Sequence, residues 1–145
     1  MNTLLLSSEA EDKQVCWVSR KKNPKTTSWQ NQRVVPNEYQ FIKKLEEHIS
    51  NNVTILELEK MTLEQQIYTV GQCKLVVGMH GAGMNSAFFM KNPHILVLNT
   101  PQNNEINLMY ALNGHYHNIN DWKVGDYKTL AKKILKIMKT KNTTN

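Results

Sequence analysis

This sequence of 145 residues lacks the features that mark several common protein classes. It has only two cysteines, Cys16 and Cys73, which lie far apart and follow no metal-binding or redox spacing. We therefore predict two small buried residues and no disulfide framework. No apolar run approaches the roughly 20 residues that cross a bilayer, and residues 1–8 lack the basic start and long apolar segment of a signal peptide. We expect a chain that is soluble as written, and the sequence indicates no compartment.

Acidic residues are scarcer than basic ones, 12 against 18, which leaves a formal net charge of +6 at pH 7. A basic excess raises the question of a nucleic-acid partner. Much of the excess lies in one polar loop and on the solvent face of a C-terminal helix: Arg20, Lys21, Lys22 and Lys25, then Lys128, Lys132, Lys133, Lys136 and Lys139. We predict that these side chains are solvated and that the chain binds no nucleic acid.

Two short patterns match the acceptor site for N-linked glycosylation, Asn-Val-Thr at residues 52–54 and Asn-Thr-Thr at residues 142–144. Such patterns often arise by chance, and they matter only in a secretory compartment. By themselves they assign no function to this chain.

Apolar, β-branched runs alternate with segments of helical periodicity along the whole chain. Strands are predicted at residues 14–19, 53–58, 74–78, 95–99 and 115–119. Helices are predicted at residues 36–49, 62–72, 84–90, 105–112 and 126–140, the second opened by a capping box of Thr62 and Gln65. This alternation predicts an α/β fold, with a Rossmann-like, mostly parallel sheet and helices on both faces. We expect a single domain over residues 1–145, with flexible ends at residues 1–12 and 141–145.

Three of these helices show a distinct apolar face, which we predict to point inward. The predicted inward residues are Phe41, Ile42, Leu45 and Ile49 in the first helix, Leu63, Ile67 and Val70 in the second, and Tyr127, Leu130, Ala131, Ile134, Leu135 and Met138 in the last.

The most informative stretch is residues 73–90, "CKLVVGMHGAGMNSAFFM". An apolar strand ends at Gly78, and a turn with almost no side-chain bulk leads into the next helix. In parallel sheets, ligands bind beyond the carboxyl ends of the strands. Glycines allow a ligand to approach the backbone, and the N–H groups of a helix start favour an anion. The turn is therefore a candidate seat for a phosphate or diphosphate.

Simpler explanations exist for the same residues. Gly78, Gly81 and Gly83 could serve only to let the strand and the helix pack closely, and His80 could be a hydrogen-bonded structural histidine. The turn is not a P-loop, because no Gly-Lys-Ser/Thr follows it, and its glycine order differs from that of the dinucleotide fingerprint.

Three stretches carry a resemblance to a known family: "RVVPNEYQFIKKL" at residues 33–45, "ILELEKMTLEQQIYTVGQCKLVVGMHGAGMNSAFFM" at residues 55–90, and "LMYALNGHYHNI" at residues 108–119. In this order they resemble glycosyltransferase family 61, over roughly residues 14–140. Members of that family have the GT-B architecture of two Rossmann-like domains facing a cleft. The resemblance implies that this chain is the C-terminal, donor-binding half.

The resemblance also implies roles for individual residues. His80, Gly81, Ala82, Gly83 and Met84 would lie against the diphosphate of a nucleotide-sugar donor. Arg33, Asn37 and Glu38 match the family's Arg-x-x-x-Asn-Glu element near the nucleotide, Arg20 occupies another basic position, and Gln66 matches the glutamine before the turn. Many family members carry an acidic residue late in the following strand, where this sequence has Leu98 and Asn99.

The implied function is inverting transfer of a sugar from a nucleotide sugar, most simply a UDP-sugar, to a hydroxyl of a glycan or protein. Guanidinium and helix-terminal N–H groups would stabilise the departing nucleoside diphosphate. The general base that deprotonates the acceptor is expected on an N-terminal or partner domain, so we name no catalytic residue in this chain. Eukaryotic members of the family act in glycan synthesis at the Golgi or endoplasmic reticulum.

Two other functions remain open from the residues alone. The chain could be a nucleotide- or phosphate-binding module without catalysis, or a truncated, degenerate copy of a transferase. An α/β hydrolase also uses a His-Gly-rich loop, but no serine here lies in the Gly-x-Ser-x-Gly motif which that class requires. We expect no cofactor beyond the donor and no metal, because His115 and His117 share a strand face without an evident third ligand.

Overall fold

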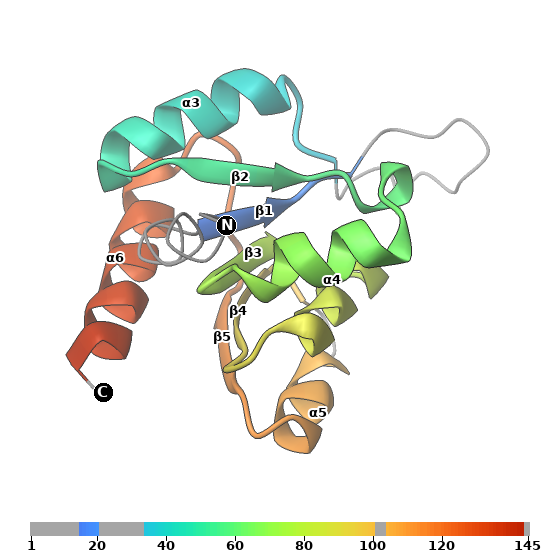
Figure 1. Ribbon diagram of the computed structural model, residues 1–145. Helices are drawn as coiled ribbons and strands as arrows, with labels where there is room; N and C mark the ends of the chain where they lie inside the picture. Colours follow the sequence, from blue (N-terminus) through green and yellow to red (C-terminus); the bar gives the residue numbers. More distant parts are fainter. Residues whose placement is uncertain (1–14, 21–33, 101–103, 144–145) are drawn as a thin grey trace, which may run out of the picture.

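A computed structural model describes residues 15–20, 34–100 and 104–143 of the chain (Figure 1). The elements in chain order are β1 (Val15–Val18), α3 (Glu38–Ile49), β2 (Val53–Leu56), the 3₁₀ helix η1 (Leu58–Lys60), α4 (Leu63–Gly71), β3 (Leu75–Met79), the 3₁₀ helix η2 (Ala82–Phe89), β4 (His94–Leu98), α5 (Asn104–Ala111), β5 (His115–Ile119) and α6 (Tyr127–Thr143). Of the predicted flexible ends, residues 1–12 lie outside the described residues, whereas α6 continues to Thr143, beyond its predicted end.

Five strands form one sheet in the order β2-β1-β3-β4-β5, and every neighbouring pair is parallel. The predicted α/β fold is thus confirmed. The chain moves from β1 to one side for β2 and then crosses to the other side for β3. The direction of winding therefore reverses between β1 and β3, and the carboxyl ends of these two strands flank the topological switch point where such sheets bind ligands.

Helices cover both faces of the sheet, as predicted. On one face, α3 and α6 pack beside each other over a core that includes Trp17 and Leu96. On the other face, α4, η2 and α5 enclose a second core that includes Val18 and Val97. Successive strand residues point to opposite faces, so β1 and β4 each supply both cores. Apart from the buried His94 at the start of β4, the residues of β1, β3 and β4 are therefore apolar or glycine on both sides.

Local sequence signals explain how these helices begin and pack. The capping box is present at α4, where the Thr62 hydroxyl accepts from the Gln65 amide and the Gln65 side chain accepts from the Thr62 amide. In α3 all four predicted inward residues are buried.

Other predicted faces are partly wrong. In α4 only Val70 is buried, while Leu63 and Ile67 are 64% and 47% exposed, because this helix lies alongside η2 and packs through its C-terminal end. In α6 Leu135 is 47% exposed, and Ile137 takes the inward position instead. Apolar spacing predicted the presence of α4 and α6 correctly, but tertiary contacts decide which of their apolar residues are covered.

The segment after the glycine turn also differs from the prediction. It forms the 3₁₀ helix η2 from Ala82, where the sequence predicts an α-helix from Met84. At the next strand, Asn99 has a left-handed conformation with φ of +57°, so β4 ends at Leu98. The link from β3 into η2 is consequently shorter than predicted, and β4, which follows η2, is the direct neighbour of β3 in the sheet.

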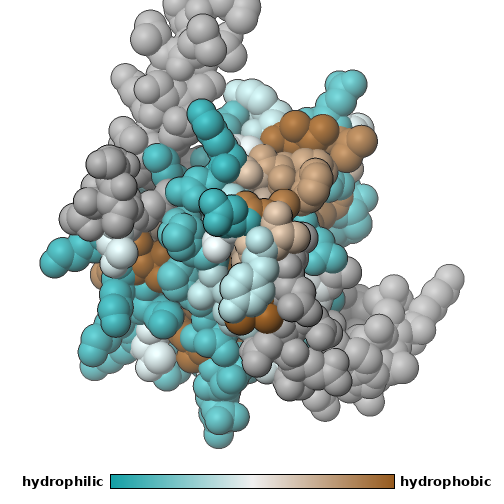
Figure 2. All heavy atoms as spheres, turned by 90° about the horizontal axis from the view of Figure 1, so that it is seen from below, coloured by the Kyte–Doolittle hydropathy of each residue, from teal (hydrophilic) through white to brown (hydrophobic). Residues whose placement is uncertain are grey.

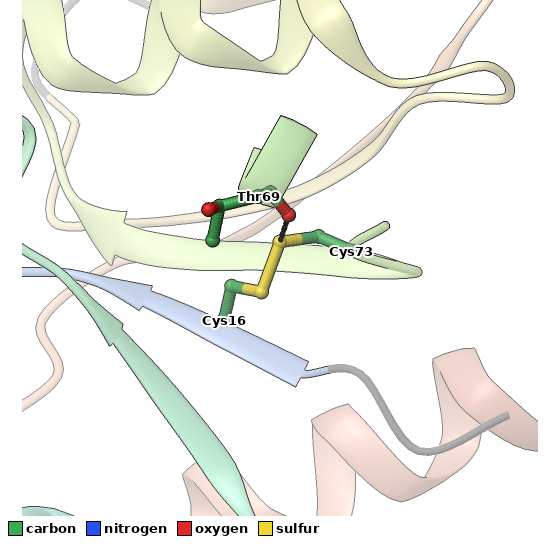
Figure 3. The surroundings of a disulfide bond; sticks show 3 residues. All are labelled: Cys16, Thr69 and Cys73. Carbon is green, nitrogen blue, oxygen red and sulfur yellow. Dashed lines mark hydrogen bonds between the residues drawn. A yellow bond between two sulfur atoms is a disulfide. The ribbon is translucent and has the colours of Figure 1, made fainter. Parts of the chain in front are cut away.

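The two cysteines are buried, as predicted, but the prediction of no disulfide is wrong, because Cys16 and Cys73 form one (Figure 3). Cys16 lies in β1, and Cys73 lies just before β3, its neighbour in the sheet. Their Cα atoms are 6.0 Å apart, within the range that disulfides bridge. Both are buried, and the Cys73 Sγ lies 3.4 Å from the carbonyl oxygen of Thr69. Sequence spacing could not reveal the pair, since only the sheet brings these strands together.

Hydrophobic side chains also reach the surface. One area of the face shown in Figure 2 is hydrophobic, and much of the remaining described surface there is hydrophilic. Along the described part of the chain, no helix has the length and apolar character needed to cross a membrane.

Candidate functional site

The switch point carries a side chain from each flanking strand. Arg20 follows β1 and His80 follows β3, and the Nη2 of Arg20 donates to the carbonyl oxygen of His80 at 3.2 Å. Both residues are half-buried. The structure therefore brings together two of the predicted donor-binding residues, which are 60 residues apart in the sequence. The Arg20 guanidinium carries a fixed positive charge at this edge of the sheet.

His80 is fastened to the neighbouring strand. Its amide donates to the Leu98 carbonyl at 3.0 Å, and its Nδ1 lies 3.4 Å from the Thr100 hydroxyl. These contacts hold the start of the glycine turn against the end of β4. His80 thus makes the contacts of a hydrogen-bonded structural histidine, and its ring lies at the same end of the sheet as Arg20.

The glycines of the turn have different roles. Gly81 is buried and has φ of +154°, a conformation that side-chain-bearing residues rarely adopt. A Cβ on Gly83 would lie 2.8 Å from the Val18 Cγ1, and one on Gly78 would lie 2.9 Å from the Met84 Sδ. Close packing therefore explains Gly78 and Gly83, whereas Gly81 meets a conformational requirement of the turn.

The remaining turn residues contribute mainly through the backbone. Met84 has a fully buried side chain in the core, and its amide donates to the Gly81 carbonyl at 3.1 Å. Ala82 starts η2. The Met84 side chain therefore serves packing beneath the turn and does not face a ligand site.

Glu38 connects α3 to the end of β1. Its Oε2 accepts from the Trp17 indole N–H at 3.0 Å, and its Oε1 accepts from the Ser19 hydroxyl at 2.6 Å. Asn37 precedes it as the N-cap, with a left-handed φ of +52°, an exposed side chain and no side-chain cap bond. Glu38 thus holds the start of α3 against the end of β1, in the segment that leads to Arg20. Arg33 lies outside the described residues.

Gln66 is linked to the glycine turn through Leu58. Its Nε2 donates to the carbonyl oxygens of Leu58 and Met61, at 3.2 and 3.4 Å, and so braces η1 against α4. The Leu58 Cδ1 lies 3.7 Å from where a Cβ on Gly83 would stand. Gln66 therefore supports the layer behind the turn.

Sequence reasoning missed a cavity of about 460 Å³ beside the turn. It is lined by Asn99, Thr100, Asn120, Asp121, Trp122 and Lys123. Asn99 shapes one wall, because its side chain pairs with the Trp122 amide and carbonyl at 2.8 Å each. Thr100 connects this cavity to His80. Positive φ values at Asn99 and Asp121 mark the two loops, although sequence alone carried only a weak signal for them.

The chain is an α/β protein with a Rossmann-like sheet, and Arg20 and the glycine turn lie at the switch point, where sheets of this class bind ligands. The sequence model for Glycosyltransferase 61 matches residues 3–97, and the chain belongs to this glycosyltransferase family. The matched range includes Arg20, Glu38 and the whole glycine turn, while the cavity loops lie beyond it. No curated protein matches the chain.

Toward the amino ends of β4 and β5, away from Arg20 and His80, three histidine side chains lie together. The His94 and His115 rings stack with centroids 4.1 Å apart, and the His94 Nδ1 lies 3.4 Å from the His117 Nε2. Over the described ranges, no group of three His, Cys, Asp or Glu side chains has a geometry that could hold a metal ion. Burial, together with the charge of Lys133 and the nearby His115, lowers the pKa of His117 from 6.5 to about 4.

This histidine should make the fold sensitive to mild acid. The unfolded chain binds a proton at His117 near pH 6.5, while the folded chain binds it only near pH 4, so stability falls as the pH decreases through this window. We expect the melting temperature of the His117→Gln variant to fall less than that of the parent between these two pH values. Thermal unfolding followed by circular dichroism measures the difference. The exposed His48, changed to Gln, is the control and should retain the full acid sensitivity; equal losses for parent and His117→Gln would contradict the assignment.

Proposed function

We propose that this chain binds the nucleoside diphosphate of a nucleotide sugar, a UDP-sugar, at the switch point, and that it forms the donor half of an inverting glycosyltransferase. The observation that carries the proposal is the hydrogen bond between the Arg20 guanidinium and the His80 carbonyl. It places a permanent cation beside the glycine turn, at the edge where parallel sheets bind ligands. Membership of the glycosyltransferase 61 family supports the assignment to sugar transfer.

The chemistry of the transfer gives these residues their roles. In an inverting reaction, the acceptor oxygen attacks the anomeric carbon on the face opposite the diphosphate. The bond from that carbon to the diphosphate oxygen breaks, and the nucleoside diphosphate leaves with the electron pair. Negative charge on the diphosphate grows as the bond breaks, so Arg20 would stabilise the transition state more than the bound donor.

The cavity beside Thr100 suits the rest of the donor. Asp121 and Asn120 offer oxygen acceptors for sugar hydroxyls, and Lys123 adds a second cation at the same loops. We propose that this cavity receives a hydroxyl-bearing part of the nucleotide sugar. Asp121 would then supply the acidic group that is missing from the end of β4, where Asn99 stands.

The acceptor side completes the proposal. A base must take the proton from the attacking hydroxyl of a glycan or protein. We propose that this base lies on an acceptor-binding domain, an N-terminal or partner domain, that faces the same edge of the sheet. On this view the chain needs no cofactor beyond the donor.

Calorimetric titration with UDP and several UDP-sugars tests donor binding. We expect the parent chain to bind UDP. The His80→Ala variant should bind UDP about tenfold more weakly, which corresponds to the ~1.4 kcal/mol of one modest hydrogen bond. Asp121→Asn should also weaken the binding of UDP-sugars. The exposed His48→Ala, on α3, is the matched control and should bind as the parent does.

The outcomes separate the competing functions. Absence of heat with every nucleotide, from a chain shown to be folded, would overturn the donor-binding proposal. Binding without sugar transfer, in the complete natural polypeptide, would instead favour a non-catalytic nucleotide-binding module.

A further inference from the structure

The turn between α3 and β2 displays one asparagine at the surface. The helix ends at Ile49, and β2 starts at Val53. Asn52 lies between them and is exposed. Hydrogen bonds hold the backbone here: the backbone N–H of Asn52 donates to the Asn51 Oδ1 at 2.9 Å, and the backbone N–H of Val53 donates to the Glu46 Oε2 at 2.8 Å. A group attached to the Asn52 side chain would extend into solvent without disturbing the core.

Asn52 also has the sequence context of an acceptor for N-linked glycans, because Thr54 follows two residues later and Val53 is not proline. Such a match means little in a chain that never meets the glycosylation machinery. The compartment is therefore the decisive question for this residue.

The disulfide bears on the compartment. Cys16 and Cys73 are the only cysteines of the chain, and they are joined in the core. Buried structural disulfides form in oxidising compartments such as the lumen of the endoplasmic reticulum and are rare in the cytosol. N-linked glycans are attached in that same lumen. The disulfide and the exposed acceptor pattern are independent observations that point to one environment.

We propose that Asn52 carries an N-linked glycan. In the attachment, the side-chain amide nitrogen of Asn52 bonds to the anomeric carbon of an oligosaccharide that a polyprenyl lipid carries through a diphosphate. The bond from that carbon to the diphosphate oxygen breaks, the lipid diphosphate leaves, and the amide nitrogen loses one proton. The host's oligosaccharyltransferase supplies the catalyst.

The position is compatible with activity at the candidate site. All strands are parallel, so Asn52, just before β2, lies at the amino ends of the strands. Arg20 and His80 follow the carboxyl ends. A glycan on Asn52 therefore leaves the donor site open. Because β2 is an edge strand, the glycan would also hinder its pairing with another chain.

Production of the chain in a eukaryotic cell, with a secretory signal sequence added, tests the proposal. We expect the parent to shift on a gel after an enzyme that removes Asn-linked glycans, and Asn52→Gln to lose one glycan. Thr54→Ala should lose the same glycan, while Thr54→Ser should keep it. Asn51→Gln is the matched control from the same turn and should remain glycosylated. Asn142→Gln, made in parallel, separates the contribution of the second acceptor pattern.

Mass spectrometry of the secreted protein gives a readout that does not depend on how the variants fold. The tryptic peptide at residues 45–60 contains this acceptor pattern alone, and deglycosylation in the enzyme's reaction converts a modified Asn52 to Asp. Conversion at Asn52 supports the proposal. An unmodified peptide from secreted, disulfide-bonded protein would overturn it, as would a number of glycans that neither Asn52→Gln nor Thr54→Ala reduces.

Discussion

Reduction of the Cys16–Cys73 disulfide should lower the free energy of unfolding by about 4 kcal/mol. The disulfide closes a loop with a sequence separation of 57 residues, and a loop of this size restricts the unfolded chain strongly. Reduction leaves both sulfur atoms in the core, so little packing is lost with the bond. Urea unfolding of the purified chain, with and without a thiol reductant, measures the difference directly.

A double variant provides the control for this result. Cys16→Ala with Cys73→Ala has no thiol to reduce, so the reductant should leave its unfolding midpoint unchanged. This variant should also be less stable than the reduced parent, because both cysteines are buried and their removal leaves a cavity. An equal midpoint for the oxidised and reduced parent would show that the disulfide does not contribute to stability.

Replacement of Arg20 by alanine should slow sugar transfer by about 100- to 1000-fold, the usual effect of losing one donor that stabilises developing charge. The reason is that the guanidinium lies beside the turn, where the proposed leaving group gains negative charge. The complete natural polypeptide, with its donor and acceptor, is the enzyme to assay. Loss in kcat larger than any rise in KM would indicate that Arg20 acts chiefly in the transition state.

Two further variants distinguish this role from general charge. Arg20→Lys retains the positive charge but loses the planar set of donors, so its rate should fall between those of the parent and Arg20→Ala. Lys132→Ala removes one cation from the exposed side of α6 and should transfer at the parental rate. Parental transfer by Arg20→Ala would contradict the proposed role.

Much of the fold could be predicted from sequence because its determinants are local. Alternating apolar strands and amphipathic helices gave the α/β class, and Thr62 with Gln65 marked the start of α4 correctly. The inward faces were harder to predict. Leu63 and Ile67 have helical spacing, but α4 packs beside η2 through its C-terminal end, so both side chains stay exposed.

The candidate site could be predicted in part. The glycine turn was predicted to follow a strand, and it lies at the carboxyl end of β3, the end of a parallel sheet where ligands bind. The family pattern supplied Arg20, which the structure places against His80. The cavity at Asn99 and Asp121 was missed because two loops build it, and loops distant in sequence leave no shared periodicity. The disulfide was missed for the same reason, since strand neighbours are set by the topology of the sheet.

The position of the disulfide also gives the chain an unusual connectivity. Cys16 and Cys73 close a covalent ring that contains α3, β2 and α4. A protease that cuts one peptide bond anywhere within this ring leaves a single covalent molecule, and the two pieces separate only when the disulfide is reduced. A nicked chain would therefore keep Arg20 and His80 on one molecule, and on a denaturing gel the two pieces would separate only under reducing conditions.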